Sequence, residues 1–224
     1  MYDKDIRVNR PDFSCDDINT LYEAKYLNLY DIRYREDAHY LEASRRKKGE
    51  LVALKDSDEF RGMLPDAVTI AVVVRIAGGE PRLLLNYEYR YPSGQFLLSP
   101  IAGLIDPQDC ETEEPLKRAA IREIYEESGL KFKDTDTIRV INPCAFSSPG
   151  MTDESNAFLY AEISIDNESE LSQEGAEGSE LFGGYELVDR KEARKLFSTG
   201  RDRYGNFYSL STWVVLAYFL MSGK

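Results

Sequence analysis

Three glutamates crowd one short segment of this chain, and their spacing is suited to holding a metal ion. The segment from Arg122 to Leu130 reads REIYEESGL and contains Glu123, Glu126 and Glu127. In a helix, residues three and four positions apart lie on the same side, so these carboxylates would share one face within a single turn. Like charges so placed repel each other unless a positive charge lies among them. A divalent cation such as Mg²⁺ would supply it, because this ion prefers oxygen ligands and is often held by carboxylates together with substrate phosphates.

The surrounding residues predict the helix that must carry these carboxylates. Residues 119–124 combine strong helix formers with an apolar stripe, which leaves the other side of the helix acidic. Pro115 follows Glu114 at the expected first turn, and Gly129 stands where a left-handed C-cap would end the helix. Arg122 could orient one carboxylate through a bidentate pair of hydrogen bonds. An ordinary solvated acidic helix face is the alternative explanation.

A strand is expected to lead into this helix from the N-terminal side. Residues 102–106, AGLID, read as a strand end that turns into a loop. Gly103 would let the backbone approach the site closely, because glycine has no Cβ.

The pattern from Glu114 to Leu130 resembles the Nudix box, the signature of hydrolases that cleave a diphosphate linked to another moiety. It reads E-x7-R-E-I-x-E-E-x-G-L in this chain. The resemblance implies that Mg²⁺, or alternatively Mn²⁺, is held by the three glutamates and by a backbone carbonyl near Ala102. It also implies catalytic roles for Glu126 and Glu127, and structural roles for the motif positions Glu114, Arg122 and Gly129.

One position departs from the family pattern, which opens with a glycine five residues before its first glutamate. Gln108 occupies that position here. Gly103 would be the family glycine, with a role at the substrate, only if about five extra residues around 107–111 lengthen the loop.

Other stretches resemble the ADP-ribose pyrophosphatase branch of the same family. The run EYRYP at 88–92 implies that Arg90 contacts the substrate, with a surface salt bridge as the alternative. The run SPGMTDE at 148–154 implies a substrate role for Pro149, with a plain turn as the alternative. Members of this branch often place a catalytic glutamate late in an acidic loop, where Glu180 matches best and Glu177 second.

The core pattern predicts an α/β fold. Residues 67–76, AVTIAVVVRI, are almost continuously apolar, as expected of a central strand covered on both faces. Further strands are expected at 82–90, 96–98, 137–146, 157–165 and 185–188, and helices at 190–197 and 211–221. The resemblance implies a Nudix-type α/β/α sandwich with a mixed sheet over residues 65–224.

Residues 1–64 are expected to form a small N-terminal β-element and a linker. The first 20 residues are polar and irregular, residues 22–34 alternate as in a strand, and residues 39–44 return after a turn. Such a ribbon is not stable alone, so it must pack on the main domain or on a second subunit. The resemblance implies a homodimer with a shared active site. The tyrosines of the N-terminal ribbon are expected in the core or in an interface, with stacking on an adenine as the alternative.

Composition excludes several classes of function. The formal net charge of −12 disfavours nucleic acid as a partner, because binding its backbone requires clustered Lys and Arg. The single histidine excludes histidine pairs and multi-histidine metal sites. Three cysteines without CxxC spacing and an N-terminus without the apolar core of a signal peptide predict a cytoplasmic protein. The apolar run at 213–221 is too short to span a bilayer, so no membrane partner is expected.

We therefore predict Mg²⁺-dependent hydrolysis of the diphosphate bond in a nucleoside diphosphate linked to a sugar. The resemblance favours ADP-ribose, which would give AMP and ribose 5-phosphate. The alternatives are a Nudix hydrolase for another nucleotide sugar or a dinucleotide, and a regulator that binds a nucleotide sugar without cleaving it.

Overall fold

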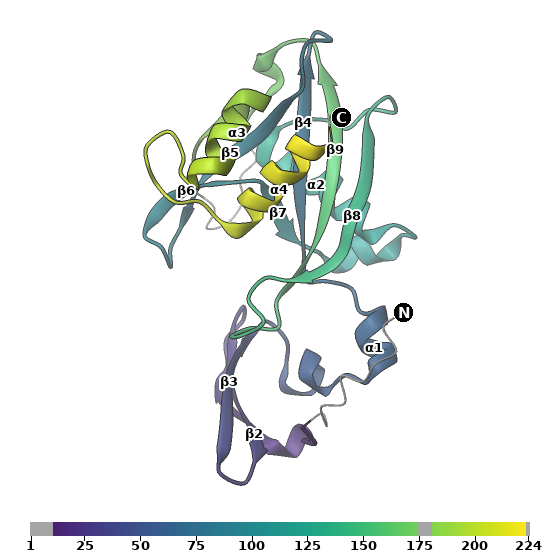
Figure 1. Cartoon of the computed structure of the whole chain (residues 1–224). Coiled ribbons are helices and arrows are strands. Elements are labelled where there is room, and N and C mark those ends of the chain that lie inside the picture. The colour runs from purple at the N-terminus through teal and green to yellow at the C-terminus, as the bar shows by residue number, and fades with distance from the viewer. Residues whose placement is uncertain (1–10, 174–180, 223–224) are drawn as a thin grey trace, which may run out of the picture. The chain divides into compact units, whose positions relative to one another are not determined.

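The computed structural model describes residues 11–173 and 181–222, which form two compact units (Figure 1). The larger unit takes in Pro65–Ala145 and the described residues from Asn156 onward. The smaller unit takes in the described residues up to Leu64 together with the segment Phe146–Ser155, which is distant from them in the sequence.

A mixed sheet forms the centre of the larger unit. Within the described residues it has seven strands, namely β4 (Ala67–Ile76), β5 (Arg82–Arg90), β6 (Gln95–Ser99), β7 (Ile101–Leu104), β8 (Thr137–Phe146), β9 (Ser155–Ile165) and β10 (Phe182–Val188). The order is β10-β5-β4-β9-β8, with β6 also paired to β5 and β7 to β4. Strand β4 runs parallel to β9 and antiparallel to β5 and β7. Every strand predicted in this part of the chain is present, with small changes at its ends.

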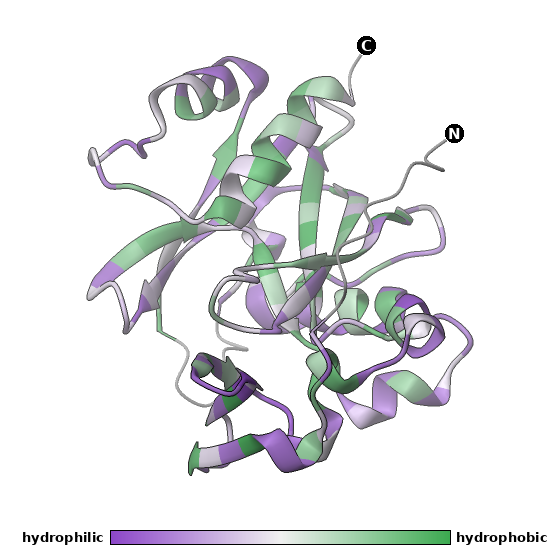
Figure 2. Cartoon of the chain, turned by 60° about the horizontal axis from the view of Figure 1, so that its bottom comes forward, coloured by the Kyte–Doolittle hydropathy of each residue, from purple (hydrophilic) through white to green (hydrophobic). Residues whose placement is uncertain are grey.

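Helices cover both faces of this sheet because β4 is apolar on both sides. Its residues Val68, Ile70, Val72 and Val74 pack in one core with α2 (Pro115–Ser128). The alternate residues Ala71 and Val73 pack in a second core with α3 (Arg190–Thr199) and α4 (Leu210–Met221). Helix α4 is largely green in Figure 2, as its apolar sequence dictates. The predicted α/β/α sandwich with a mixed sheet is confirmed.

The smaller unit contains an antiparallel sheet built from β1 (Ile18–Tyr22), β2 (Asn28–Arg35) and β3 (Ala38–Ser44), followed by the short helix α1 (Ser57–Gly62). The predicted hairpin is present as β2 and β3, but the strand expected over residues 22–34 begins only at Asn28. The prediction of irregular structure over the first 20 residues was wrong for β1. Only Ile18 of this strand is buried, so no alternation of apolar residues marked it in the sequence.

The segment Phe146–Ser155 completes the smaller unit through contacts to β3. The backbone N–H of Ala43 donates to the carbonyl of Met151 at 3.0 Å, and the hydroxyl of Tyr40 donates to the carbonyl of Gly150 at 2.6 Å. Among the described residues of both units, no helix has the length and apolar character needed to cross a membrane.

Candidate active site

Helix α2 carries the glutamates and forms for the local reasons that the sequence indicated. Pro115 occupies its first turn, and Ala119, Ala120 and Ile124 bury its apolar side against the sheet. Gly129 ends the helix with φ 70°, a left-handed conformation that glycine adopts without strain. The helix therefore holds its acidic side toward β5 and β7.

Glu127 is fixed by residues from two strands. Its side chain is buried, and its carboxylate accepts hydrogen bonds from Asn86 Nδ2 on β5 at 2.7 Å and from the backbone N–H of Ala102 on β7 at 3.0 Å. Burial raises the pKa of the Glu127 carboxyl well above its usual range, and the negative charges of Glu88 and Glu123 raise it further. The two hydrogen bonds lower this pKa but do not cancel the effect of burial. A buried carboxyl of this kind remains protonated more readily unless a cation lies nearby.

Glu123 lies directly against the backbone of Gly103. A Cβ placed on Gly103 would come within 2.0 Å of Glu123 Cδ and Oε1. Only glycine therefore allows β7 and the carboxylate to approach so closely. The structure brings Gly103, Glu123 and Glu127 together, as the predicted site requires.

Arg122 connects the carboxylates of α2 to the preceding loop. Its Nη1 donates to Glu123 Oε1 at 2.7 Å and to Glu126 Oε2 at 2.9 Å, and its Nη2 donates to the carbonyl of Leu104 at 2.8 Å. Burial acts to lower the pKa of the guanidinium, but the hydrogen bond to Asp109 and the charge of Glu123 outweigh it, so the pKa is raised. Arg122 thus stays charged and balances the acidic cluster.

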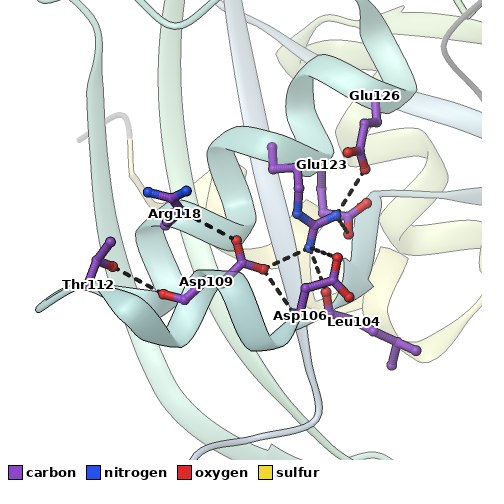
Figure 3. Close-up of polar contacts among 8 residues, drawn as sticks. Leu104, Asp106, Asp109, Thr112, Arg118, Glu123 and Glu126 are labelled. Carbon is purple, nitrogen blue, oxygen red and sulfur yellow. Dashed lines mark hydrogen bonds and ion pairs between the residues drawn. The ribbon is translucent and has the colours of Figure 1, made fainter.

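Asp109 holds Arg122 from the other side (Figure 3). It lies on the 3₁₀ helix Pro107–Glu111, and its side chain is buried. Its Oδ2 accepts from Arg122 Nη2 at 2.9 Å and from the backbone N–H of Asp106 at 2.9 Å. The residues expected only to lengthen the loop therefore contribute a buried carboxylate to the site.

The donor set fits a divalent cation. Glu123 and Glu127 are hard oxygen donors held in place, and the missing Cβ of Gly103 leaves the backbone of β7 beside them. In the described residues, however, no three or more His, Cys, Asp and Glu side chains are gathered closely enough to hold an ion as they stand. The carboxylates of Glu123 and Glu126 are turned to Arg122 instead. Metal binding here would require these carboxylates to contact the ion as well as Arg122.

The other predicted residues have different surroundings. Glu114 stands at the N-cap of α2, where its side chain pairs with Lys117 at 2.5 Å. Arg90 lies at the end of β5 and pairs with Glu88 at 2.5 Å, the kind of salt bridge that was its alternative explanation. Pro149 lies in the smaller unit and lines a cavity there. Glu180, and Glu177 with it, falls outside the described residues.

Sequence reasoning missed Asn86, Glu88 and Asp109 as parts of the site. Asn86 is buried, holds Glu127, and accepts a hydrogen bond from Gln173 Nε2 at 3.0 Å. Position 86 carried one signal, which is a polar residue inside the otherwise apolar run LLLNY at 83–87. Such a residue needs a hydrogen-bond partner when the strand is buried.

Comparison with known proteins points to one family. No family model matches the chain. The chain is 28% identical over 151 residues to an uncharacterized Nudix hydrolase of Schizosaccharomyces pombe, covering 67% of this chain and 69% of that protein. It is 33% identical over 101 residues to a putative nudix hydrolase of Caenorhabditis elegans, covering 45% of this chain and 41% of that protein. Both of these similar proteins are named as Nudix hydrolases.

Proposed function

We propose that the chain is a divalent-cation-dependent hydrolase of diphosphate bonds. The observation that carries the proposal is the buried pair Glu123 and Glu127 on α2, held against Gly103 and Ala102 of β7. The names of the two similar proteins support a general Nudix hydrolase activity. Glu123, Glu126 and Glu127 would hold the ion, with Mg²⁺ as the first choice and Mn²⁺ as the second.

The bound ion would neutralise phosphate charge and lower the pKa of an attacking water. Asn86 and the Ala102 N–H fix the Glu127 carboxylate, and Arg122 fixes Glu123. Glu126 is the most exposed of the three glutamates on α2, with 31% of its side chain accessible, and is our candidate to accept the proton of the water. The water oxygen bonds to one phosphorus as the bridging P–O bond breaks, so the products are two phosphate monoesters.

We further propose ADP-ribose as the substrate, which yields AMP and ribose 5-phosphate. The support is the EYRYP run at the end of β5, where Arg90 is half exposed and pairs with Glu88; a substrate phosphate would replace Glu88 as its partner. Glu180, which the resemblance favours as the catalytic loop glutamate, is the alternative proton acceptor.

We also propose a homodimer in the cytoplasm. Large apolar side chains are exposed on and beside the three-stranded sheet, namely Leu21, Tyr22, Tyr26, Leu27 and Leu41. Exposed groups of this kind are typical of protein interfaces. In the described residues Cys15, Cys110 and Cys144 are free thiols, which supports a reducing compartment.

A substrate panel tests the proposed specificity. The purified chain would be incubated with ADP-ribose, other nucleotide sugars and dinucleotides, with Mg²⁺ or with a chelator, and monophosphate release would be followed. We expect the highest kcat/KM for ADP-ribose and none with the chelator. Preference for another diphosphate would reject ADP-ribose but keep the hydrolase, whereas ligand binding without any cleavage would reject the hydrolase.

A further inference from the structure

The smaller unit contains a cavity of its own, with a volume of about 410 Å³. Small-molecule sites typically have volumes of roughly 300–1,000 Å³. Aromatic side chains line much of this one, namely Phe13, Tyr34, Tyr40 and Phe146. The cavity is formed by the inner face of β2 and β3, by the turn that contains Val52, and by the segment Phe146–Ser155. Every residue that lines it belongs to this unit.

A buried carboxyl group lies in the wall of this mostly apolar cavity. Glu42 on β3 is 7% exposed, and its Oε2 is buried without any hydrogen-bond partner among the described residues. A buried polar atom without a partner is costly, so few proteins keep one without a use for it. Burial raises the pKa of Glu42 to about 7, and the neighbouring charge of Asp153 adds to the effect. The positive charge of Arg46 acts to lower this pKa, but it does not offset burial and the charge of Asp153.

The charges that face Glu42 leave the cavity acidic. Asp153 also lines it, and Asp153 is already engaged by the Val52 N–H at 3.2 Å and by Arg46 Nη1 at 3.4 Å. Tyr30 lies opposite Glu42 on β2, and its hydroxyl donates to the carbonyl of Arg46 at 2.9 Å. Arg46 is one cation beside two acids, so a single positive charge is missing when both acids are ionised.

We propose that this cavity binds a small organic cation that carries N–H groups on an apolar body, such as an arylalkyl amine or an amidine. Three features of the cavity match three features of such a ligand. The aromatic walls attract a cation through their ring faces. The apolar surface accommodates the body of the ligand, and Glu42 Oε2 accepts a charge-assisted hydrogen bond from its N–H. An anion would be repelled by Glu42 and Asp153, and a purely apolar molecule would leave Glu42 unpaired.

Benzylamine and benzamidine are suitable probes, with benzyl alcohol as the neutral analogue of similar shape. Binding to the full chain would be measured by calorimetry and by NMR shifts, with a chelator present. We expect saturable binding of the cations, and at least roughly tenfold weaker binding of the alcohol, because it lacks the charge-assisted hydrogen bond. Affinity for the cations should rise from pH 6 to pH 8, since Glu42 must ionise to pair with them.

Two variants locate the binding. Glu42→Gln keeps the shape and removes the charge, so cation affinity should fall at least about tenfold and lose its pH dependence. Ala53→Phe changes no charge and fills space in the cavity wall, so all probes should bind more weakly. Circular dichroism and the unfolding midpoint would establish that both variants are folded. Equal binding of benzyl alcohol, unchanged affinity in Glu42→Gln, or no binding of either cation would overturn the proposal.

Discussion

At the scale of single residues, the candidate active site depends on the close approach of Gly103 to Glu123. In Gly103→Ala, the new Cβ would overlap the Glu123 carboxylate, which is the flexible end of a side chain and can move away. We therefore expect the free energy of unfolding to change by only about 1 kcal/mol. Turnover should nevertheless fall by roughly tenfold or more, because the displaced carboxylate is the expected metal ligand.

The matched control for this substitution is Gly49→Ala, where a Cβ would meet nothing within 4 Å. Chemical denaturation and steady-state kinetics would be measured on both variants. Full activity in Gly103→Ala would show that the position of Glu123 does not matter for turnover.

Glu42 gives a prediction about stability and pH. Its pKa is raised from 4.5 to about 7 in the folded protein, so its favourable contribution is present below the unfolded pKa and is lost as pH rises through about 7. Glu42→Gln should therefore be more stable than the natural chain at pH 8, by on the order of 2 kcal/mol, and close to equal near pH 4. Urea unfolding at both pH values measures this difference, with the exposed Glu36→Gln as control. If the free energies of unfolding of Glu42→Gln and the natural chain differed by the same amount at pH 4 and pH 8, the buried state of Glu42 would be contradicted.

At the scale of elements, the 3₁₀ helix Pro107–Glu111 supports helix α2 through Asp109 and Arg122. Asp109→Asn removes the charge that holds the guanidinium, which leaves Arg122 free to pair more tightly with Glu123 and Glu126. We expect weaker Mn²⁺ binding by electron paramagnetic resonance and a kcat lowered by about tenfold, the usual scale for a residue that orients metal ligands.

Glu111→Gln is the control for this element, because Glu111 is exposed on the same turn. The Asp109→Asn variant should also show a larger change in kcat than in KM, since Asp109 contacts Arg122 rather than any expected substrate group. An unchanged affinity for Mn²⁺ would make Asp109 a purely structural residue.

The sequence predicted the elements better than the contacts between them. Helix α2 and its end at Gly129 follow from local residue types, and β4 follows from ten consecutive residues that are nearly all apolar. The hydrogen bond from Asn86 to Glu127 joins residues 41 positions apart, and no local pattern predicts such a contact. The role of Asp109 was hidden for a related reason, because an acidic residue in a loop is normally solvated.

At the scale of the whole molecule, the proposed homodimer can be tested on the outer face of the smaller unit. Leu41 is 58% exposed on β3, opposite Asp31 in the register of the sheet. If this face is an interface, Leu41→Asp should convert a species of twice 25.6 kDa into one of 25.6 kDa in sedimentation equilibrium. Leu210→Asp, at an exposed leucine of α4 in the larger unit, is the control. A natural chain that sediments as a monomer at micromolar concentration would remove the dimer from the proposal.

The central claim is that α2 supports metal-dependent cleavage of a diphosphate, and Glu127→Gln tests it most directly. Glutamine has the shape of the natural residue and retains an oxygen for the Ala102 N–H, but its amide nitrogen would face the donor Asn86 Nδ2, so the unfolding midpoint would be measured to establish that the variant is folded. Phosphate monoester release from ADP-ribose and other diphosphates would be followed for both chains with Mg²⁺ and with a chelator. We predict metal-dependent release by the natural chain and a rate lower by roughly 10²–10⁴ for Glu127→Gln. Equal rates for the two folded chains, or release that continues with the chelator, would contradict the claim.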